Sequence, residues 1–145
     1  MGSLLVTIQL LLIALLGVWA APELWSLRAP ALAWAFALVG VGTGLWTLAY
    51  NRPGNFNIRP TPHATGHLIC DGPYRWIRHP MYSAVICCAL AAALAIGSMS
   101  GWLGAAALTA VLVIKLGLEE VLLLQKYAEY DPYRAHTWRL LPGLF

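Results

Sequence analysis

Four long apolar runs, at residues 3–21, 30–50, 81–97 and 102–118, constrain the fold of this chain more than any other feature. The first two are long enough to cross a bilayer as helices, and the last two would span it if the bilayer thins or the helices extend into flanking polar residues. Hydrophobic residues make up 60% of the 145 residues and charged residues only 10%. The sequence therefore predicts a single all-α membrane domain with about four transmembrane helices.

The two polar segments, residues 51–80 and 119–145, hold most of the cationic side chains. Prolines and glycines interrupt the first segment, which predicts a folded loop instead of a helix. Apolar residues continue at helical spacing after Glu120 and predict an interfacial helix, before Asp131 and Pro132 restart the chain. The positive-inside rule places both segments and the N-terminus on the cytoplasmic side, and the Ala- and Leu-rich spans suggest a bacterial cytoplasmic membrane.

Local signals refine these helices. Pro30 is suited to the first turn of the second helix, and residues 97–101 predict the turn of an antiparallel helical hairpin. Three small residues of the second run predict a face that packs closely against another helix, with a ligand groove as the alternative: Gly40, Gly42 and Gly44.

Several classes of protein and site are disfavoured. The net charge of +3 is spread without a basic block, so nucleic acid is not an expected partner. The three cysteines form neither a disulfide framework nor a zinc pattern. His63 and His67 have the i, i+4 spacing of metal ligands on a helix, but Pro62 and Gly66 argue against a helix there, so no metal is expected. A secretory signal is the alternative for the first run, although no Lys or Arg precedes it.

A dense polar and aromatic stretch, GPYRWIRHPMY, occupies residues 72–82 between apolar runs. A basic membrane flank is the simple interpretation, but a flank needs only Lys or Arg and not this combination of residue types. Cationic side chains at the edge of hydrocarbon are costly unless they meet a partner or a ligand. We therefore treat this stretch as a candidate functional site.

A second constellation, Lys115 with Glu119 and Glu120, ends the fourth apolar run. In an antiparallel hairpin of the last two runs, His79 and Glu119 become neighbours although forty positions separate them. Lys115 and Glu119 share one helical face, so a structural ion pair is an alternative to a functional role. Two adjacent carboxylates cannot both face that lysine, which leaves at least one for a ligand or for water.

The order of these motifs, with a hydrophobic hairpin between the last two, resembles the isoprenylcysteine carboxyl methyltransferase family, which is related to the phospholipid N-methyltransferases: Gly72-Pro73-Tyr74, Arg78-His79-Pro80-Met81-Tyr82, and Glu119-Glu120. The resemblance covers roughly residues 51–142. It implies a membrane enzyme that binds S-adenosylmethionine between its membrane helices and a cytoplasmic cap and methylates a lipophilic acceptor.

The resemblance also implies site residues. The cofactor contacts carried over from the family are Gly66, His67, Leu68, Ile69, Tyr74, His79, Pro80, Met81, Tyr82 and Glu119. The catalytic end would hold Arg78, with Lys115 binding the acceptor group and Glu120 orienting or deprotonating the acceptor. The family usually has arginine where this chain has Lys115, and lysine keeps the charge but loses the planar fork that binds a carboxylate in two places.

The chemistry leaves several acceptors open. Methyl transfer from a sulfonium to an anionic oxygen neutralises two charges, so a dry pocket favours it and no general base is needed. An amine acceptor must be neutral to attack, and Glu120 or His79 would then accept its proton. Carboxyl O-methylation of an isoprenylcysteine-like substrate is the expected reaction. The alternatives are N-methylation of a phospholipid headgroup, S- or O-methylation of a small lipophilic molecule, a sterol-reductase-like enzyme and a non-catalytic membrane scaffold.

Overall fold

The computed structural model describes residues 2–51 and 67–145 of the chain. The elements in order are α1 (Gly2–Trp25), α2 (Ala31–Tyr50), the 3-10 helix η1 (Gly72–Arg75), α3 (Pro80–Ile96), α4 (Met99–Lys126) and α5 (Tyr130–Ala135). In this part of the chain the only β-type pairing is an isolated bridge between Ile77 and Trp138. The predicted all-α fold is therefore confirmed for the described residues.

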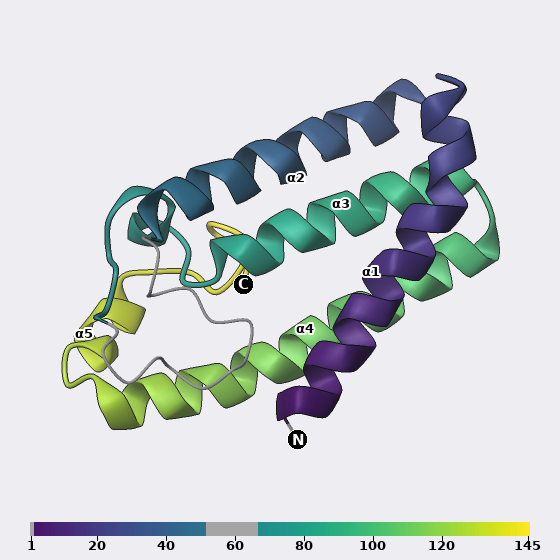
Figure 1. Cartoon of the computed structure of the whole chain (residues 1–145). Helices are drawn as coiled ribbons and strands as arrows, with labels where there is room; N and C mark the ends of the chain where they lie inside the picture. Colours follow the sequence, from purple (N-terminus) through teal and green to yellow (C-terminus); the bar gives the residue numbers. More distant parts are fainter. Residues whose placement is uncertain (1, 52–66) are drawn as a thin grey trace.

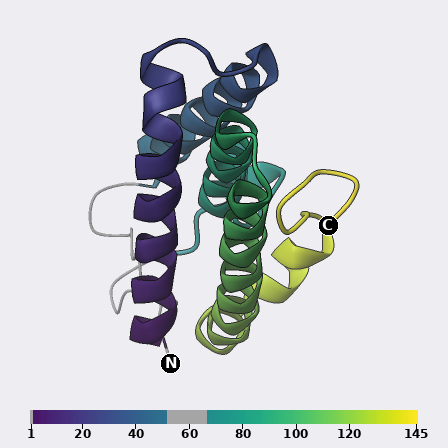
Figure 2. The ribbon, with the colours of Figure 1, turned by 90° about the vertical axis from the view of Figure 1, so that its right-hand side faces the viewer.

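The helices form a bundle in which α2 lies along α3, and α3 returns into α4 as an antiparallel hairpin (Figure 1). Helix α1 packs on α3 and α4. Figure 2 shows α1 and α4 side by side, and the start of α1 lies at the same end of the bundle as the end of α4. Helix α5 and the C-terminal residues fold back to that end of the hairpin (Figure 1). The polar stretches predicted to converge are thus at one end of the bundle.

Each predicted apolar run forms a helix, and the helix of the last run differs most from its predicted boundaries. Helix α4 begins at Met99 and continues to Lys126, so the interfacial helix expected after Glu120 is the last part of α4. Residues strong in helix propensity follow one another through this region, and nothing in it breaks the hydrogen-bonded ladder. The expected restart at Asp131 and Pro132 lies inside α5.

Two expected turns also change. The hairpin turn is shorter than residues 97–101, because Gly97 ends α3 in the left-handed region with φ 65° and Ser98 is already the residue that precedes α4. Pro30 lies just before α2 with ψ 150°, in extended conformation, so it precedes the first turn instead of occupying it. A proline at this position still ends the preceding loop without costing a helical hydrogen bond.

Helices α1 and α2 are long and apolar enough to cross a membrane, judged by length and composition, and α3 is apolar but has 17 residues. Their outer surfaces carry large apolar side chains, including Leu11, Val18 and Leu38, which are 65%, 70% and 73% exposed. Continuous apolar surface of this kind suits contact with lipid better than contact with water. The four-span topology, the single-domain boundaries and the cytoplasmic placement of the polar segments stay predictions.

Close packing of α2 on α3 depends on glycine. A Cβ atom added at Gly40 would lie 2.6 Å from Sγ of Cys88 and 2.9 Å from the carbonyl oxygen of Ala84, and one at Gly44 would lie 3.7 Å from Cβ of Ala84. At Gly42 nothing lies within 4 Å. Residues four apart share a helical face and residues two apart do not, so the predicted packing face is confirmed at Gly40 and Gly44 and is wrong for Gly42.

Candidate active site at the start of α3

The segment before α3 is held in place from both sides. Gly72 has φ +58°, and a Cβ atom there would meet the Tyr50 ring at 2.6 Å, so only glycine fits this turn. Farther along, the backbone pairs with the tail, since the Arg78 amide donates to the Trp138 carbonyl at 2.7 Å and the His79 amide donates to the Arg139 carbonyl at 3.1 Å. The end of α2 and the C-terminal tail thus hold the segment that contains the Arg-His-Pro motif.

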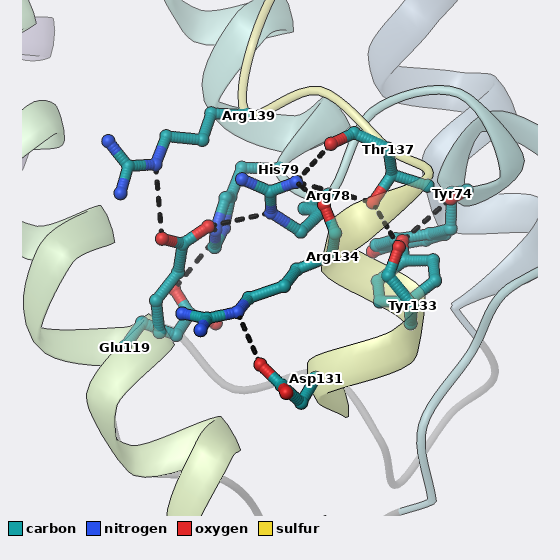
Figure 3. A network of polar contacts seen from close by, with 10 residues as sticks. Tyr74, Arg78, His79, Glu119, Asp131, Tyr133, Arg134, Thr137 and Arg139 are labelled. Carbon is teal, nitrogen blue, oxygen red and sulfur yellow. Dashed lines mark hydrogen bonds and ion pairs between the residues drawn. The ribbon is translucent and has the colours of Figure 1, made fainter. Parts of the chain in front are cut away.

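Glu120 is the centre of a buried ion network. Arg78 Nε donates to its Oε1 at 2.7 Å, and Arg139 Nε donates to its Oε2 at 3.1 Å. The Arg78 and Glu120 side chains are only 9% and 7% exposed. Arg78 also donates from Nη1 to the backbone carbonyls of Arg134 and Thr137. Figure 3 shows Arg78, His79 and Arg139 converging on the end of α4 from the loop and the tail.

These partners set the ionisation of Glu120. Burial alone would raise the pKa of its carboxyl group, but the adjacent His79 ring and Arg78 guanidinium outweigh burial and lower the pKa to about 2. A carboxylate with so low a pKa is a weak base near neutral pH. Through its contacts with Arg78 and Arg139, Glu120 joins the loop, α4 and the tail. Its role in orienting or deprotonating an acceptor stays a prediction.

Glu119 has a different environment, and its side chain is 26% exposed. Tyr82 donates its hydroxyl hydrogen to Oε2 of Glu119 at 2.6 Å. The Nδ1 atom of His79 lies 3.8 Å from the same oxygen, which confirms that the hairpin makes His79 and Glu119 neighbours. Both contacts fall on one carboxylate oxygen, so the other is the more available to a ligand.

His79 lies between the two carboxylates. Its ring stacks on that of Tyr82 with centroids 5.4 Å apart and an angle of 5° between the planes. Its Nε2 atom is 3.5 Å from Oε1 of Glu120, but the contact lacks hydrogen-bond geometry, and the buried nitrogen has no hydrogen-bond partner among the described residues. A buried polar atom without a partner is uncommon and marks a place where a ligand group or water completes the site.

Tyr74 adds another aromatic hydroxyl group to this end of the bundle. Burial, followed by the negative charge of Glu119, raises the pKa of Tyr74 to about 12, so its hydroxyl group stays protonated at neutral pH. Its carbonyl oxygen accepts a 2.6 Å hydrogen bond from the hydroxyl of Tyr133 in α5 (Figure 3). Burial also raises the pKa of Tyr133. Both hydroxyl groups are therefore hydrogen-bond donors.

Lys115 is buried inside the bundle, with 2% of its surface exposed. Its Nζ atom donates to Oε1 of Gln9 at 2.8 Å and lies 5.2 Å from the centroid of the Tyr82 ring. Within the described ranges 2–51 and 67–145, no carboxylate lies within 4 Å of this ammonium group, so the alternative of an ion pair with Glu119 is wrong.

The structure thus brings together seven of the predicted site residues: Tyr74, Arg78, His79, Tyr82, Lys115, Glu119 and Glu120. Pro80 is buried and Met81 half-buried in the first turn of α3. His67 is exposed, and Leu68 and Ile69 are half-buried, in the irregular segment before η1. Gly66 and His63 lie outside the described residues, and in the part that is described no group of His, Cys, Asp or Glu is arranged to hold a metal ion.

Sequence reasoning missed several residues of this site. Arg139 and Thr137 come from the tail, where no periodic pattern places a side chain, and Ser83 donates to the carbonyl oxygen of Leu140 at 2.6 Å. Gln9 carried a signal, because it is one of three polar residues in the first apolar run, but only the packing of α1 on α4 reveals its partner.

Comparison with known proteins gives a family. Residues 30–130 match the family described as phospholipid methyltransferase. No curated protein and no solved structure matches the chain significantly. The matched range includes α2, α3 and α4 with the stretch at residues 72–82 and the Glu119-Glu120 pair, and the match supports a membrane methyltransferase activity. The chain therefore belongs to the phospholipid methyltransferase family.

Proposed function

We propose that this chain transfers a methyl group from S-adenosylmethionine to a lipophilic acceptor within the membrane. The observation that carries the proposal is the position of Glu119, which is partly exposed and held by Tyr82 and His79 while Lys115 lies on the Tyr82 ring. One site thus has an anionic end and a cationic end, and the family match supports methyl transfer as its chemistry.

The anionic end fits the cofactor. When bound, S-adenosylmethionine supplies a methyl group on a sulfonium, which is electrophilic. Glu119 would hold its cationic or hydroxyl groups, because only one oxygen of this carboxylate is engaged among the described residues. The Nε2 of His79, which has no hydrogen-bond partner among the described residues, and the protonated hydroxyl of Tyr74 would complete the polar contacts. Pro80 and Met81 lie beside them in the first turn of α3. The predicted contacts before η1, residues 66–69, remain part of this proposal.

The cationic end favours an acceptor with an anionic oxygen. Lys115 has three N–H donors, and the contacts of its ammonium in the described residues are a carboxamide and an aromatic face. Glu120 is engaged by Arg78 and Arg139 and is a weak base, which suits an acceptor that needs no deprotonation. Carboxyl O-methylation of an isoprenylcysteine-like substrate is our first candidate reaction.

N-methylation of a phospholipid headgroup is the second candidate, and the description of the matching family favours it. Lys115 would then bind the phosphate as a point charge. The proton of the amine would go to His79, whose Nε2 has no hydrogen-bond partner in the described part of the chain, in preference to Glu120.

The test is turnover of methyl-labelled cofactor by the protein purified in detergent, with a farnesylcysteine, a phosphatidylethanolamine and a lipophilic thiol as separate acceptors. A methyl ester releases labelled methanol in mild base, whereas N-methyl and S-methyl products do not. Glu119→Gln should weaken binding of S-adenosylhomocysteine, and Lys115→Ala should raise the acceptor KM while that binding is retained. Thr109→Val is the control on α4, because this hydroxyl donates to the Ala105 carbonyl of its own helix.

Absence of saturable S-adenosylhomocysteine binding by a folded sample would overturn the proposal in favour of a non-catalytic scaffold. Saturable binding of a nicotinamide cofactor instead would favour the reductase alternative. Unchanged acceptor KM in Lys115→Ala would remove this residue from the acceptor end.

A further inference from the structure

Helix α1 lies before the part of the chain that matches the family, yet it sends a polar side chain to the site. Gln9 is 8% exposed and is the buried polar residue of α1, on the same helical face as Leu16. That face is packed on α4, since Leu16 Cδ2 lies 3.0 Å from the Cβ position of Gly104. The backbone that carries Gln9 is therefore fixed relative to α4.

The partner of Gln9 is an ammonium group that forms no ion pair with a carboxylate of the described residues. A buried cation is costly unless it is paired, and such groups in membrane helices are retained mainly for function. A carboxylate at position 9 would neutralise Lys115, whereas the carboxamide accepts one hydrogen bond and leaves the positive charge in place. Because the same Nζ lies 5.2 Å from the Tyr82 ring centroid, the ammonium is also held against the residue that binds Glu119.

We propose that Gln9 is a positioning and specificity-determining residue, which holds the Lys115 ammonium over Tyr82 without neutralising it. The site then selects an acceptor with an anionic oxygen group, a carboxylate or a phosphate, attached to an apolar tail. The inference rests on the proposed function and deepens it, because it makes α1 part of the acceptor end of the site. Gln9 acts through Lys115 and is not itself a catalytic residue.

Gln9→Glu is the decisive variant, because it keeps the hydrogen bond to Lys115 and adds a negative charge. A purely structural role for Gln9 predicts that this variant is as stable as the wild type and binds acceptors equally well, since an ion pair replaces a neutral contact. A role in selectivity predicts a similar or higher melting temperature together with weaker binding of anionic acceptors. Gln9→Leu removes the hydrogen bond, and the melting temperature of this variant shows how much the hydrogen bond to Lys115 stabilises the fold.

Binding can be measured without turnover, by calorimetry of the full chain in detergent. The probes are an N-acetylated farnesylcysteine with its carboxamide as the neutral partner, and a short-chain phosphatidylethanolamine with the matching diacylglycerol. In the pair that the wild type binds, Gln9→Glu should lower the affinity for the member with the carboxylate or phosphate by about tenfold or more, because the new charge cancels that of Lys115. The affinities for the member without that group and for S-adenosylhomocysteine should change little. Thr7→Val is the control on α1, since this exposed hydroxyl bonds only the Ser3 carbonyl.

The outcomes separate the two proposals. Gln9-dependent binding of an anionic probe by a protein that shows no methyl transfer would retain this inference and reject the proposed activity. Methyl transfer with equal anionic-probe affinity in wild type and Gln9→Glu would retain the activity and overturn the inference. Equal losses for the neutral and anionic probes would also overturn it, because they would show a change of shape and not of charge.

Discussion

Arg78 donates a hydrogen bond to Glu120 across 2.7 Å, although 42 positions separate the two residues in the chain. The contact joins the loop before α3 to the last part of α4, and Arg139 ties the tail to the other oxygen of the same carboxylate. One buried anion thus joins the loop, α4 and the tail, in addition to the backbone bridge between Ile77 and Trp138. This anion fixes the geometry in which His79 and Tyr82 face Glu119.

Loss of Arg78 should therefore destabilise the fold. We expect Arg78→Ala to lower the free energy of unfolding by about 3–5 kcal/mol, because it leaves a buried carboxylate with one partner fewer. Arg134→Ala is the matched control, since Arg134 pairs with Asp131 on the surface, where the two side chains are 45% and 67% exposed. That pair should contribute less than about 1 kcal/mol. Denaturant unfolding in detergent measures both, and equal losses would contradict the buried network.

The same network predicts acid sensitivity. The pKa of Glu120 falls from 4.5 to about 2 on folding, so the unfolded chain binds its proton first as the pH falls. The stabilisation by this group is complete above about pH 4.5 and is lost progressively toward pH 2. Melting temperatures followed across this window should fall less steeply in Glu120→Gln than in the wild type. Parallel curves for the two proteins would show that another group dominates.

The sequence predicted the relationship between α3 and α4 better than it predicted their ends. A hairpin turn near Gly97 was enough to bring His79 and Glu119 together, because an antiparallel hairpin places the start of one helix beside the end of the other. The end of α4 was missed because Glu119 and Glu120 look like the border of an apolar span, whereas in the structure their partners allow the helix to continue. Local pattern does not contain that information.

The partners of Lys115 show the same limit. Its position on one helical face with Glu119 followed from the sequence, but Gln9 lies 106 positions away and meets Lys115 only when α1 packs on α4. Arg139 was equally hidden, since an irregular tail has no period from which to predict a direction. Contacts between distant segments are set by packing, which sequence pattern alone does not specify.

Substitutions at two glycines of α2 should have opposite effects on stability. Gly40→Ala places a methyl group 2.6 Å from Sγ of Cys88 and 2.9 Å from a backbone oxygen, so α2 and α3 must separate, at a cost of about 1–3 kcal/mol. Gly42→Ala meets nothing within 4 Å and should gain up to about 1 kcal/mol from helix propensity. Thermal unfolding of the two variants tests the pair, and a loss in Gly42→Ala equal to that in Gly40→Ala would contradict the assigned packing face.

The tail should stabilise the motif before α3 through Ser83. Its hydroxyl donates to the Leu140 carbonyl at 2.6 Å, and Ser83→Ala should cost about 1 kcal/mol. Hydrogen exchange at the amides of Arg78 and His79, which bond the tail backbone, should become faster. Ser26→Ala is the control, because that exposed hydroxyl bonds the Pro22 carbonyl within its own segment. Unchanged exchange in Ser83→Ala would mean that the tail docks independently of this hydrogen bond.

The last prediction separates the two duties of Tyr82, whose hydroxyl holds Glu119 and whose ring faces Lys115. Tyr82→Phe removes only the hydroxyl, so Glu119 loses a charge-assisted hydrogen bond of about 1.5–3 kcal/mol, and affinity for S-adenosylhomocysteine should fall by roughly 10- to 100-fold. The retained ring should leave the acceptor KM nearly unchanged, whereas Tyr82→Leu should change both.

Tyr133→Phe is the comparison for Tyr82→Phe, because it deletes a hydroxyl with a hydrogen bond of the same 2.6 Å length, made to the Tyr74 carbonyl instead of to Glu119. It should lower the melting temperature and leave cofactor affinity close to that of the wild type, since the lost bond is to a backbone carbonyl and Glu119 keeps its partners. Calorimetric titration and thermal unfolding of both variants distinguish the two effects. Equal affinity losses in Tyr82→Phe and Tyr133→Phe would place the effect in the fold and remove the hydroxyl of Tyr82 from the cofactor end of the site.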